Sequence, residues 1–363
     1  MSEIKKICHF TSAHEALDDR IFLKECVSLR KAGYDVYIVA KGDDSIRDGV
    51  TINGCGFSKN KLQRLFFFAK HVYKIAKSLD CDVYHFHDPE LLPYGIKLKK
   101  LGKKVIFDSH EDVPAQILDK EWIPSLFRKF ISILYKRYET KAVKLFDGVV
   151  TATPHIAERF DGRANKIVII NNYPKLDDII YQTKSFEERE QIVCYAGGIN
   201  QMRGEAVMVA AMKNIKGRLI LAGPHDNDNI ESEVCANVEY IGKITRAEVN
   251  ELYGKSRCGF VLYQPAANHF EAQPIKMFEY MAAGLPFIAS DFPLWEKIVE
   301  ENNCGICVNP RDTNAVSEAC RFLLDNPEKG QEMGWKGREL VMKKYNWNVE
   351  EEKLLEFYKN LEI

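Results

Sequence analysis

The chain has 363 residues, 46% of them hydrophobic and 28% charged, and a net charge of −1. This composition is ordinary for a soluble globular protein, and the length exceeds one typical domain, so we expect two domains. No apolar run approaches the roughly 18 residues of a membrane-spanning helix, which excludes a transmembrane protein. The ten cysteines have no metal-ligand spacing, and the N-terminus has no secretory pattern. We therefore expect reduced thiols in a cytoplasmic protein that is soluble or peripheral to the plasma membrane.

The charge is divided unevenly along the chain. Residues 1–170 contain 29 Lys and Arg against 22 Asp and Glu, a net +7, and the remainder contains 22 against 30, a net −8. Two windows concentrate basic residues among aromatic and aliphatic ones, residues 59–77 and residues 120–144. Helices of this kind can rest on an anionic membrane surface. Equally, their apolar stripes can pack on a sheet while the lysines are solvated, and the sequence leaves both interpretations open.

The first half of the chain alternates β-rich runs with helical patterns. Helices are predicted at 20–31, 61–79 and 91–101, in a long region ending near 145, and in a short segment that starts near 154. The strands predicted between them are residues 4–11, 35–40, 83–87, 104–108 and 148–152. Strands that alternate with helices predict a parallel sheet covered on both faces.

The same alternation restarts at residue 191. A helix is predicted at 205–213, and further strands are predicted at 192–196, 218–222, 238–241, 259–262 and 286–289. The polar stretch before them has no clear periodicity, so residues 173–189 are the expected linker between a first domain, 1–172, and a second, 190–347. Two doubly wound α/β domains result. In such sheets ligands bind outside the carboxyl ends of the strands, which predicts a cleft between the domains.

Three loops at strand ends in the first half carry histidines and carboxylates. They are residues 12–20, 85–90 and 108–112. Such groups at the mouth of a parallel sheet are well placed for function, although a single histidine is more often structural. His110 is the strongest candidate, because Asp108, Glu111 and Asp112 surround it in sequence with polar groups.

A glycine turn follows the first strand of the second half. Gly197 and Gly198 would let backbone amides approach a phosphate, and Arg203 could grip it through two hydrogen bonds. The turn matches neither G-x-G-x-x-G nor G-x-x-x-x-G-K-[ST], which argues against a nicotinamide dehydrogenase and a P-loop ATPase. A plain strand-to-helix turn is the alternative.

The segment 270–286 is the most informative part of the chain. Pro274 fits a first helical turn, and Gly284 with Pro286 predicts the helix end. Glu271 then lies just before the helix, while Lys276 and Glu279 share one of its faces. A helix N-terminus and a lysine attract phosphate, and carboxylates accept hydrogen bonds from sugar hydroxyls. The alternative is a surface helix with an ordinary Lys–Glu pair.

Together these windows resemble the retaining glycosyltransferases of family 4, which have the GT-B fold of two Rossmann-like domains facing a central cleft. Glu271 and Glu279 match the paired glutamates of that family, and Met281-Ala-Ala-Gly-Leu-Pro-Phe-Ile-Ala-Ser-Asp291 is specific to it. Residues 238–253, with Ile244, look like the segment that borders the donor base. Asn346-Trp347 and the helix after it resemble the C-terminal helix that crosses back, so residues 348–363 are assigned to the first domain.

The resemblance also implies roles for individual residues. Glu271 would contact donor-sugar hydroxyls and Glu279 the ribose, while His110 matches the active-site histidine. Arg203 holds the usual lysine position, but Gly198 holds the usual arginine position, so Lys276 is expected to supply the missing charge. The residues expected to bind the donor are Gly197, Gly198, Arg203, Ile244, Glu271, Lys276 and Glu279. The residues expected on the acceptor side are His14, Asp18, Arg20, His87 and Glu111. The expected catalytic residues are His110, Glu271, Arg203 and Lys276.

The function implied is retaining transfer of a sugar from a UDP- or GDP-type donor to a saccharide or lipid-linked saccharide. Residues 18–25, 87–93 and 108–111 look like a bacterial branch that makes surface polysaccharides such as capsule, O-antigen or exopolysaccharide. We expect no metal, no cofactor and no nucleic-acid partner. Two alternatives remain: a non-hydrolysing nucleotide-sugar 2-epimerase with the same architecture, and a non-catalytic GT-B partner protein.

Overall fold

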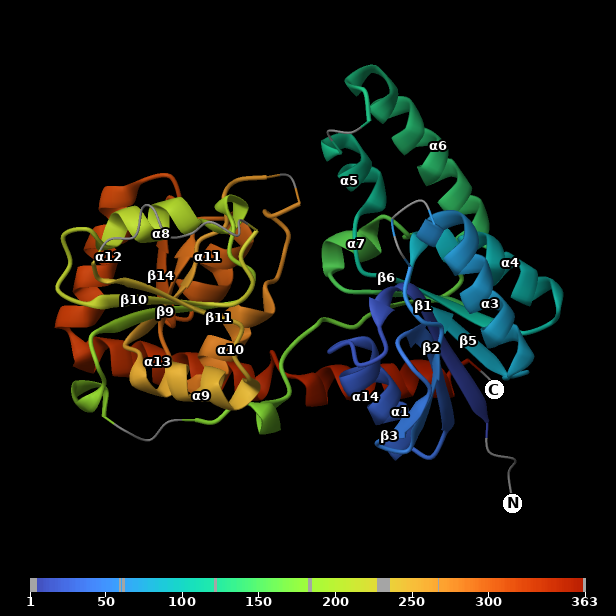
Figure 1. The fold of residues 1–363 in the computed structure, drawn as a ribbon, viewed down its shortest axis with the longest axis horizontal. Helices are drawn as coiled ribbons and strands as arrows, with labels where there is room; N and C mark the ends of the chain where they lie inside the picture. The colour runs from blue at the N-terminus through green and yellow to red at the C-terminus, as the bar shows by residue number, and fades with distance from the viewer. Residues whose placement is uncertain are drawn as a thin grey trace. The chain divides into compact units, whose positions relative to one another are not determined.

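The computed structural model describes residues 5–58, 60, 63–120, 123–181, 185–226, 236–266 and 268–361. The chain forms two compact units. The first comprises Met1–Asn172 and Asn348–Ile363, and the second comprises Tyr173–Trp347. Each unit is built around one sheet with helices on its faces (Figure 1). Within the described part of the chain, no helix is both long and apolar enough to cross a membrane.

The sheet of the first unit has eight strands in the order β3-β4-β2-β1-β5-β6-β7-β8. All neighbours are parallel except the antiparallel pair β3 and β4. The strands are β1 (Lys6–Glu15), β2 (Asp35–Lys41), β3 (Ser45–Arg47), β4 (Val50–Gly54), β5 (Val83–Phe86), β6 (Lys104–Ser109), β7 (Gly148–Thr151) and β8 (Ile167–Ile169). The strand order reverses between β1 and β5, where a doubly wound sheet opens its ligand crevice.

Helices cover both faces of this sheet. The two predicted helices at 20–31 and 61–79 each begin with a π-helical segment, Ile21–Cys26 and Arg64–Phe68; residues 61 and 62 lie outside the described residues. The α-helices are α1 (Val27–Lys31), α3 (Ala69–Ser78), α4 (Leu92–Lys100), α5 (Val113–Asp119), α6 (Ser125–Val143), α7 (Pro154–Glu158) and α14 (Trp347–Lys359). Because both faces are covered, the central strands β5 and β7 are buried along their whole length, including the polar side chains of His85 and Thr151.

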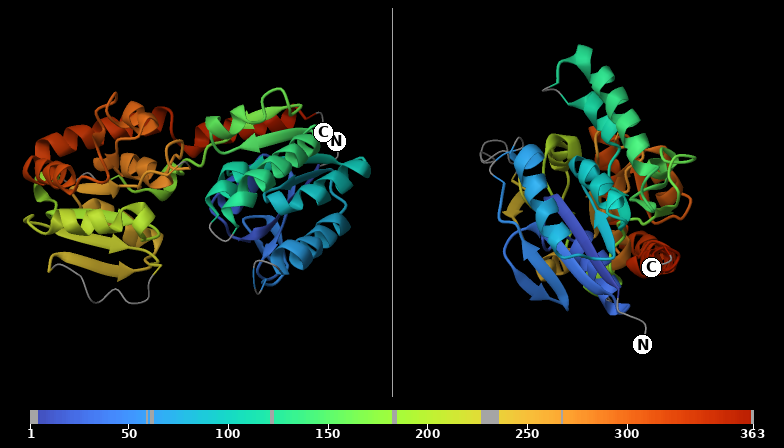
Figure 2. Two further views of the ribbon diagram at one scale, coloured as in Figure 1. Left: turned by 90° about the horizontal axis from the view of Figure 1, so that it is seen from above. Right: turned by 90° about the vertical axis from the view of Figure 1, so that its right-hand side faces the viewer.

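The second unit has a six-stranded parallel sheet in the order β11-β10-β9-β12-β13-β14. Its strands are β9 (Ile192–Ala196), β10 (Arg218–Ala222), β11 (Val238–Gly242), β12 (Cys258–Val261), β13 (Phe287–Ser290) and β14 (Gly305–Val308). Its α-helices are α8 (Glu205–Met212), α9 (Arg246–Lys255), α10 (Ile275–Ala283), α11 (Pro293–Val299), α12 (Thr313–Asp325) and α13 (Pro327–Lys343). The order reverses between β9 and β12, so the crevice of this unit lies at the carboxyl end of β9. Figure 2 shows the two sheets from other directions.

The segment expected to be a linker belongs to the second unit. Tyr173, Ile179 and Phe186 are buried in its hydrophobic core, with Phe278 and Tyr280 of α10 among the neighbours. In its described residues, 173–181 and 185–189, the segment has no strand and contains only the short helical turns Leu176–Asp178 and Phe186–Glu188. Its sequence lacks periodicity for that reason, although three of its apolar side chains pack in the core.

Candidate active site

The glycine turn after β9 is shaped to receive the side chain of Lys276. Gly197 has a φ of +143°, and a Cβ added there would lie 2.8 Å from Nζ of Lys276. Its N–H donates to the carbonyl of Ala222, which holds the turn on the end of β10. The Asn200 side chain then accepts a hydrogen bond from the N–H of Arg203, and this contact starts the helical turn Gln201–Arg203. The turn needs glycine at 197 for both its backbone conformation and its space.

Lys276 is buried in the first turn of α10, with only 4% of its surface exposed. Its Nζ has no hydrogen-bond partner among the residues that the structure describes, and it lies 3.7 Å from the ring centroid of Tyr195. Burial, followed by the nearby Arg203, lowers the pKa of Lys276 well below its ordinary value. An unpaired buried ammonium is costly, so this position suits an anionic ligand.

Arg203 lies at the same turn as this lysine. The Arg203 guanidinium and Nζ of Lys276 each lie 5.8 Å from the ring centroid of Tyr263, so both cations share one aromatic neighbour. A Cβ added at Gly198 would lie 3.2 Å from Nη1 of Arg203. Gly198 carries no charge itself, but it leaves room for the guanidinium beside its backbone. The two cations, brought together from the turn after β9 and from α10, can neutralise a diphosphate.

Glu279 is held by two groups that the helix spacing did not predict. Its Oε1 accepts a hydrogen bond from Nη2 of Arg246 at 2.8 Å, and its Oε2 accepts one from the Tyr253 hydroxyl at 3.1 Å. Both partners lie on α9, which begins with a capping box between Thr245 and Glu248. The alternative of a surface helix with an ordinary Lys276–Glu279 pair is therefore wrong, because both side chains are buried and Glu279 is bound by side chains of another helix.

Glu271 lies in the turn before α10 and is exposed. The loop that follows it is anchored at two points. The indole N–H of Trp295 donates to the carbonyl of Ala272 at 2.7 Å, and the Tyr173 hydroxyl donates to the Gln273 side chain at 2.8 Å. Ile244, just before α9, packs half-buried against the core of this unit. The structure thus places every expected donor-site residue in the second unit, and Gly197, Gly198, Arg203 and Lys276 lie together around Tyr195.

His110 follows β6 in the first unit and lies against Asp108. Its Nδ1 is 3.3 Å from Oδ1 of Asp108, and its Nε2 is 3.2 Å from Nδ1 of His87. Burial lowers the pKa of His110 to about 3. Although burial opposes ionisation of Asp108, Arg20 keeps the pKa of that carboxyl well below its usual range. His110 is therefore a neutral imidazole beside a fixed carboxylate at neutral pH.

The expected acceptor-side residues divide into an accessible and a buried group. His14 is partly exposed, its Nδ1 lies 3.0 Å from Oδ2 of Asp18, and its ring centroid is 5.7 Å from that of His110. Glu111 is exposed. Arg20 and His87 are almost completely buried, and Arg20 binds Asp108 and the carbonyl of Ile170. Arg20 and His87 therefore present almost no surface to a ligand.

Sequence reasoning missed several residues that shape the first unit's site. Asp88 accepts hydrogen bonds from the Thr11 hydroxyl at 2.7 Å and the N–H groups of Ser12 and Ala13, so it holds the loop after β1. The buried His9, Glu25 and Tyr358 also lie near His87 or Asp108 but come from other elements. Adjacent polar residues at a strand end could have indicated Asp88, whereas no local pattern connects Tyr358 to His110.

Comparisons with known proteins agree with this architecture. A family model described as Glycosyl transferases group 1 matches residues 177–340, and one described as Glycosyltransferase Family 4 matches residues 22–173. A GDP-mannose-dependent alpha-(1-6)-phosphatidylinositol monomannoside mannosyltransferase of Mycobacterium tuberculosis is 25% identical over 183 residues, 47% of this chain and 47% of that protein. The chain thus spans about half the length of the curated relatives it matches.

Solved structures match over nearly the whole chain. The sucrose-phosphate synthase of Thermosynechococcus elongatus is 18% identical with a TM-score of 0.77, covering 98% of this chain and 99% of that one. HepE of Anabaena in complex with UDP and glucose is 11% identical with a TM-score of 0.74, covering 98% and 100%. These likenesses confirm the predicted GT-B fold. The chain belongs to the GT-B glycosyltransferases of group 1 and family 4.

Proposed function

We propose that the protein transfers a sugar, with retention of anomeric configuration, from a UDP- or GDP-type donor to a saccharide or lipid-linked saccharide. The observation that carries this proposal is the buried ammonium of Lys276, which lies beside Arg203 at the glycine turn and has no hydrogen-bond partner in the described parts of the chain. HepE was solved with UDP and glucose, and the mycobacterial relative depends on GDP-mannose, so both donor types are supported.

The chemistry assigned to this site is stabilisation of the departing diphosphate. Negative charge develops on the leaving group as its bond to the sugar breaks, and fixed cations in a water-poor site stabilise that charge strongly. Lys276 and Arg203 supply two such cations, so transfer proceeds without a metal ion. The leaving phosphate itself can accept the proton of the attacking hydroxyl, and no separate base is assigned.

The remaining residues of the site orient the donor. Glu279 is fixed by Arg246 and Tyr253 and is assigned to the ribose hydroxyls. Glu271 is free to reach sugar hydroxyls from its exposed turn. His110 is assigned to the donor sugar near the reaction centre, with His14 and Glu111 on the acceptor side. Carboxylates suit the binding of ribose and sugar hydroxyls because their oxygens accept hydrogen bonds from hydroxyl groups.

The test is transfer from a panel of nucleotide sugars in the presence of EDTA, with products analysed by NMR for anomeric configuration. Arg203→Ala and Lys276→Ala are each expected to reduce turnover by about 10²–10³-fold. Lys297→Ala, an exposed lysine on α11, is the matched control and should retain wild-type turnover. Wild-type rates in both site variants would contradict the assignment. Conversion of the free nucleotide sugar without an acceptor would instead indicate a 2-epimerase, and failure to bind any nucleotide would indicate a non-catalytic partner.

We further propose that the enzyme acts at the cytoplasmic face of the plasma membrane in surface-polysaccharide synthesis, with α6 as its contact to anionic lipid. The two basic windows differ in a way that supports α6. In window 59–77, Phe68, Ala69, Val72 and Ala76 are buried in the core, while Phe67 is 74% exposed; residues 59, 61 and 62 lie outside the described residues.

The α6 window presents apolar and basic side chains together. Leu126 is 83% exposed and Phe130 is 60% exposed, and Lys129, Lys136 and Arg137 are exposed on the same helix. Residues 121 and 122 of this window lie outside the described residues. Exposed large hydrophobic groups among lysines are typical of a helix that inserts into the headgroup region of an anionic bilayer.

A further inference from the structure

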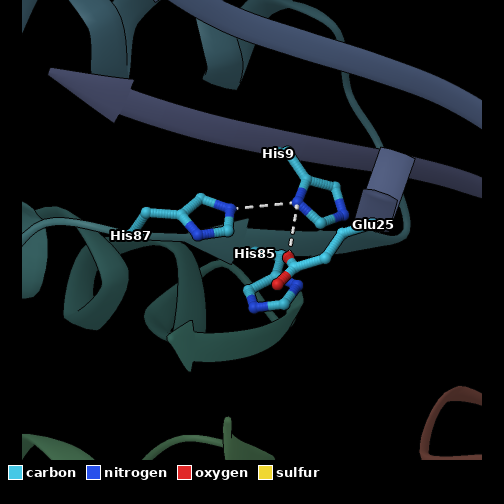
Figure 3. A group of neighbouring side chains, drawn as sticks. All are labelled: His9, Glu25, His85 and His87. Atoms are coloured by element: carbon cyan, nitrogen blue, oxygen red, sulfur yellow. Dashed lines mark hydrogen bonds and ion pairs between the residues drawn. The ribbon is translucent and has the colours of Figure 1, made fainter. Parts of the chain in front are cut away.

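A row of buried histidines lies behind His110 in the first unit. His9 of β1 pairs in register with His85 of β5, and His87 follows directly after β5. Figure 3 shows these three imidazoles with the carboxylate of Glu25. His9, His85 and His87 are almost completely buried, and the proposed transfer gives His9 and His85 no role. Buried polar groups of this kind need hydrogen-bond partners, which here are largely one another.

The row forms a continuous chain of hydrogen-bond distances that ends at His110. The hydroxyl of Tyr358, on α14, lies 3.3 Å from Nε2 of His9. Nδ1 of His9 lies 3.0 Å from Nε2 of His87, as the dashed line in Figure 3 marks. Nδ1 of His87 lies 3.2 Å from Nε2 of His110. Four segments of the chain, α14, β1 and the residues that follow β5 and β6, thus supply a single path of polar contacts.

Asp108 decides the direction in which this chain donates. Its carboxylate is buried and binds Nη2 of Arg20 at 3.1 and 3.3 Å, so it stays ionised. One of its oxygens lies 3.4 Å from Nδ1 of His87, and the other lies 3.3 Å from Nδ1 of His110. A carboxylate attracts an N–H and repels a nitrogen lone pair at these distances. Both Nδ1 atoms therefore carry the hydrogen.

The tautomers of the remaining groups follow from the hydrogens on Nδ1 of His87 and of His110. His87, with its hydrogen on Nδ1, accepts at Nε2, so His9 donates from its own Nδ1. Nε2 of His9 then accepts from the Tyr358 hydroxyl, whose oxygen also lies 2.8 Å from Nδ1 of His85. The opposite direction would turn two lone pairs toward Asp108. Burial lowers the pKa of His9 and His85 well below the ordinary value, so these imidazoles are neutral and each has one hydrogen.

Each side chain of Figure 3 offers a ligand atom within 4.8 Å of the others, which is close enough to hold a metal ion. His9 and His87 direct one nitrogen at each other, and the rings of His85 and His87 stack 4.8 Å apart at 21°. Near-parallel stacked rings direct their lone pairs side by side. Nε of Arg20, 3.2 Å from Glu25, adds a buried positive charge. A hydrogen-bonded row fits this geometry better than a metal site.

We infer that Tyr358, His9 and His87 are positioning residues that hold His110 as its Nδ1–H tautomer, with Nε2 as a hydrogen-bond acceptor. This inference rests on the role of His110 in the proposed sugar transfer. The N–H of His87 is within reach of both His110 and Asp108, so it can turn fully to Asp108 when a donor hydroxyl approaches Nε2 of His110. The histidine is thereby prepared to accept a hydrogen bond from the sugar in a fixed orientation.

The tautomers can be read by NMR without any enzymatic assay. Protein labelled with ¹⁵N-histidine contains nine histidines, and two-bond ¹H–¹⁵N correlations report which ring nitrogen carries the hydrogen. His9, His87 and His110 are all expected to be Nδ1–H. An Nε2–H tautomer at His110 would overturn the inference, whatever the activity of the protein. If the wild type transfers no sugar, the proposed function fails while this measurement still decides the tautomer.

Variants at His87 separate hydrogen bonding from packing. His87→Asn keeps an amide donor close to the Nδ1 position, whereas His87→Leu removes it. Turnover is expected to fall by about 10–100-fold in the leucine variant, as for other groups that orient a functional histidine, and to be largely retained with asparagine. Nucleotide affinity should not change in either. Equal losses in both variants would show a packing role only. His71→Leu, at an exposed position on α3, is the control.

Tyr358→Phe provides a second test should His87→Leu not fold. It removes one hydroxyl and keeps the ring, so the Nε2 resonance of His9 is expected to shift toward that of a nitrogen without a hydrogen-bond donor. Tyr34→Phe is the matched control, because the Tyr34 ring lies 6.1 Å from that of Tyr358. An unmoved His9 resonance in Tyr358→Phe would contradict the relay.

Discussion

Among single residues, Lys276 is expected to destabilise the free protein and to be stabilised by a bound anionic ligand. Its ammonium is buried beside a second cation and two aromatic rings, with no hydrogen-bond acceptor among the described residues. Proteins seldom bury an unpaired charge, because desolvation costs several kcal/mol. A phosphate oxygen would supply the missing partner. The stability of the free protein and its affinity for nucleotide are therefore expected to oppose one another at this position.

Replacement of this lysine tests that opposition. Lys276→Met keeps the volume and removes the charge, so the melting temperature of the nucleotide-free protein is expected to rise, while affinity for UDP or GDP falls by at least about tenfold. Thermal unfolding and calorimetry measure the two quantities. Lys297→Met is the exposed control. A variant that loses both stability and affinity would show that Lys276 contributes to the free fold instead.

The lowered pKa of Lys276 gives this penalty a pH dependence. The unfolded chain has an ordinary lysine pKa of about 10.4 and binds the proton more tightly than the folded state does, so the penalty is fully present below the folded pKa. It is relieved as pH rises toward the ordinary value. The difference in melting temperature between Lys276→Met and wild type should therefore shrink at alkaline pH. A difference that grows with pH would contradict the assignment.

At the scale of elements, the glycine turn and α10 form one unit of the site. Gly197 leaves the space that Nζ of Lys276 occupies, and its backbone conformation is rarely adopted by other residues. Gly197→Ala is expected to displace the lysine and weaken nucleotide binding by about tenfold, in addition to a backbone strain of order 1 kcal/mol. Gly102→Ala has a positive φ but open space around it, and separates strain from displacement. Equal nucleotide affinity in both variants would refute the steric role of Gly197.

The exposed face of α6 is expected to bind anionic membranes. Phe130→Glu together with Leu126→Glu should abolish sedimentation with phosphatidylglycerol vesicles, because both the apolar contact and the charge attraction are weakened. Trp335→Glu, at a half-exposed position on α13, is the control. Binding by the wild type should fall as salt concentration rises. Equal sedimentation of wild type and double variant would show that α6 is not the membrane contact.

At the scale of the whole molecule, the sequence predicted most elements but not all of the site. Long apolar runs bounded by turns revealed the central strands, whereas β3, β4, β8 and β14 have three to five residues and no fully buried run, so no pattern distinguished them. The resemblance to family 4 predicted Arg203 and Lys276 in one phosphate site, and the structure places both beside Tyr263. The partners of Glu279 come from α9, and Tyr358 reaches His9 from the C-terminal helix, 349 residues away. Spacing cannot reveal contacts that depend on how distant elements pack.

Thermal unfolding of the whole protein can identify the base of the nucleotide that it binds. A ligand at a hundred times its Kd stabilises the native state by about 2.7 kcal/mol. For a domain of this size, each kcal/mol of added stability raises the melting temperature by about 2–4 °C. A screen of UDP, GDP, ADP, CMP and TDP should give a clear rise for UDP or GDP. A rise for ADP alone would contradict the proposed donor class.

The most direct test of the central claim compares the binding of a nucleoside diphosphate with that of its nucleoside. Calorimetry on wild type, Lys276→Met and Arg203→Ala, with UDP against uridine and GDP against guanosine, isolates the contribution of the two phosphates. Wild type is expected to prefer the diphosphate by at least about a hundredfold, equivalent to two charge-assisted contacts, and each variant is expected to lose much of this preference. An unchanged preference in both variants would show that these cations do not hold the diphosphate.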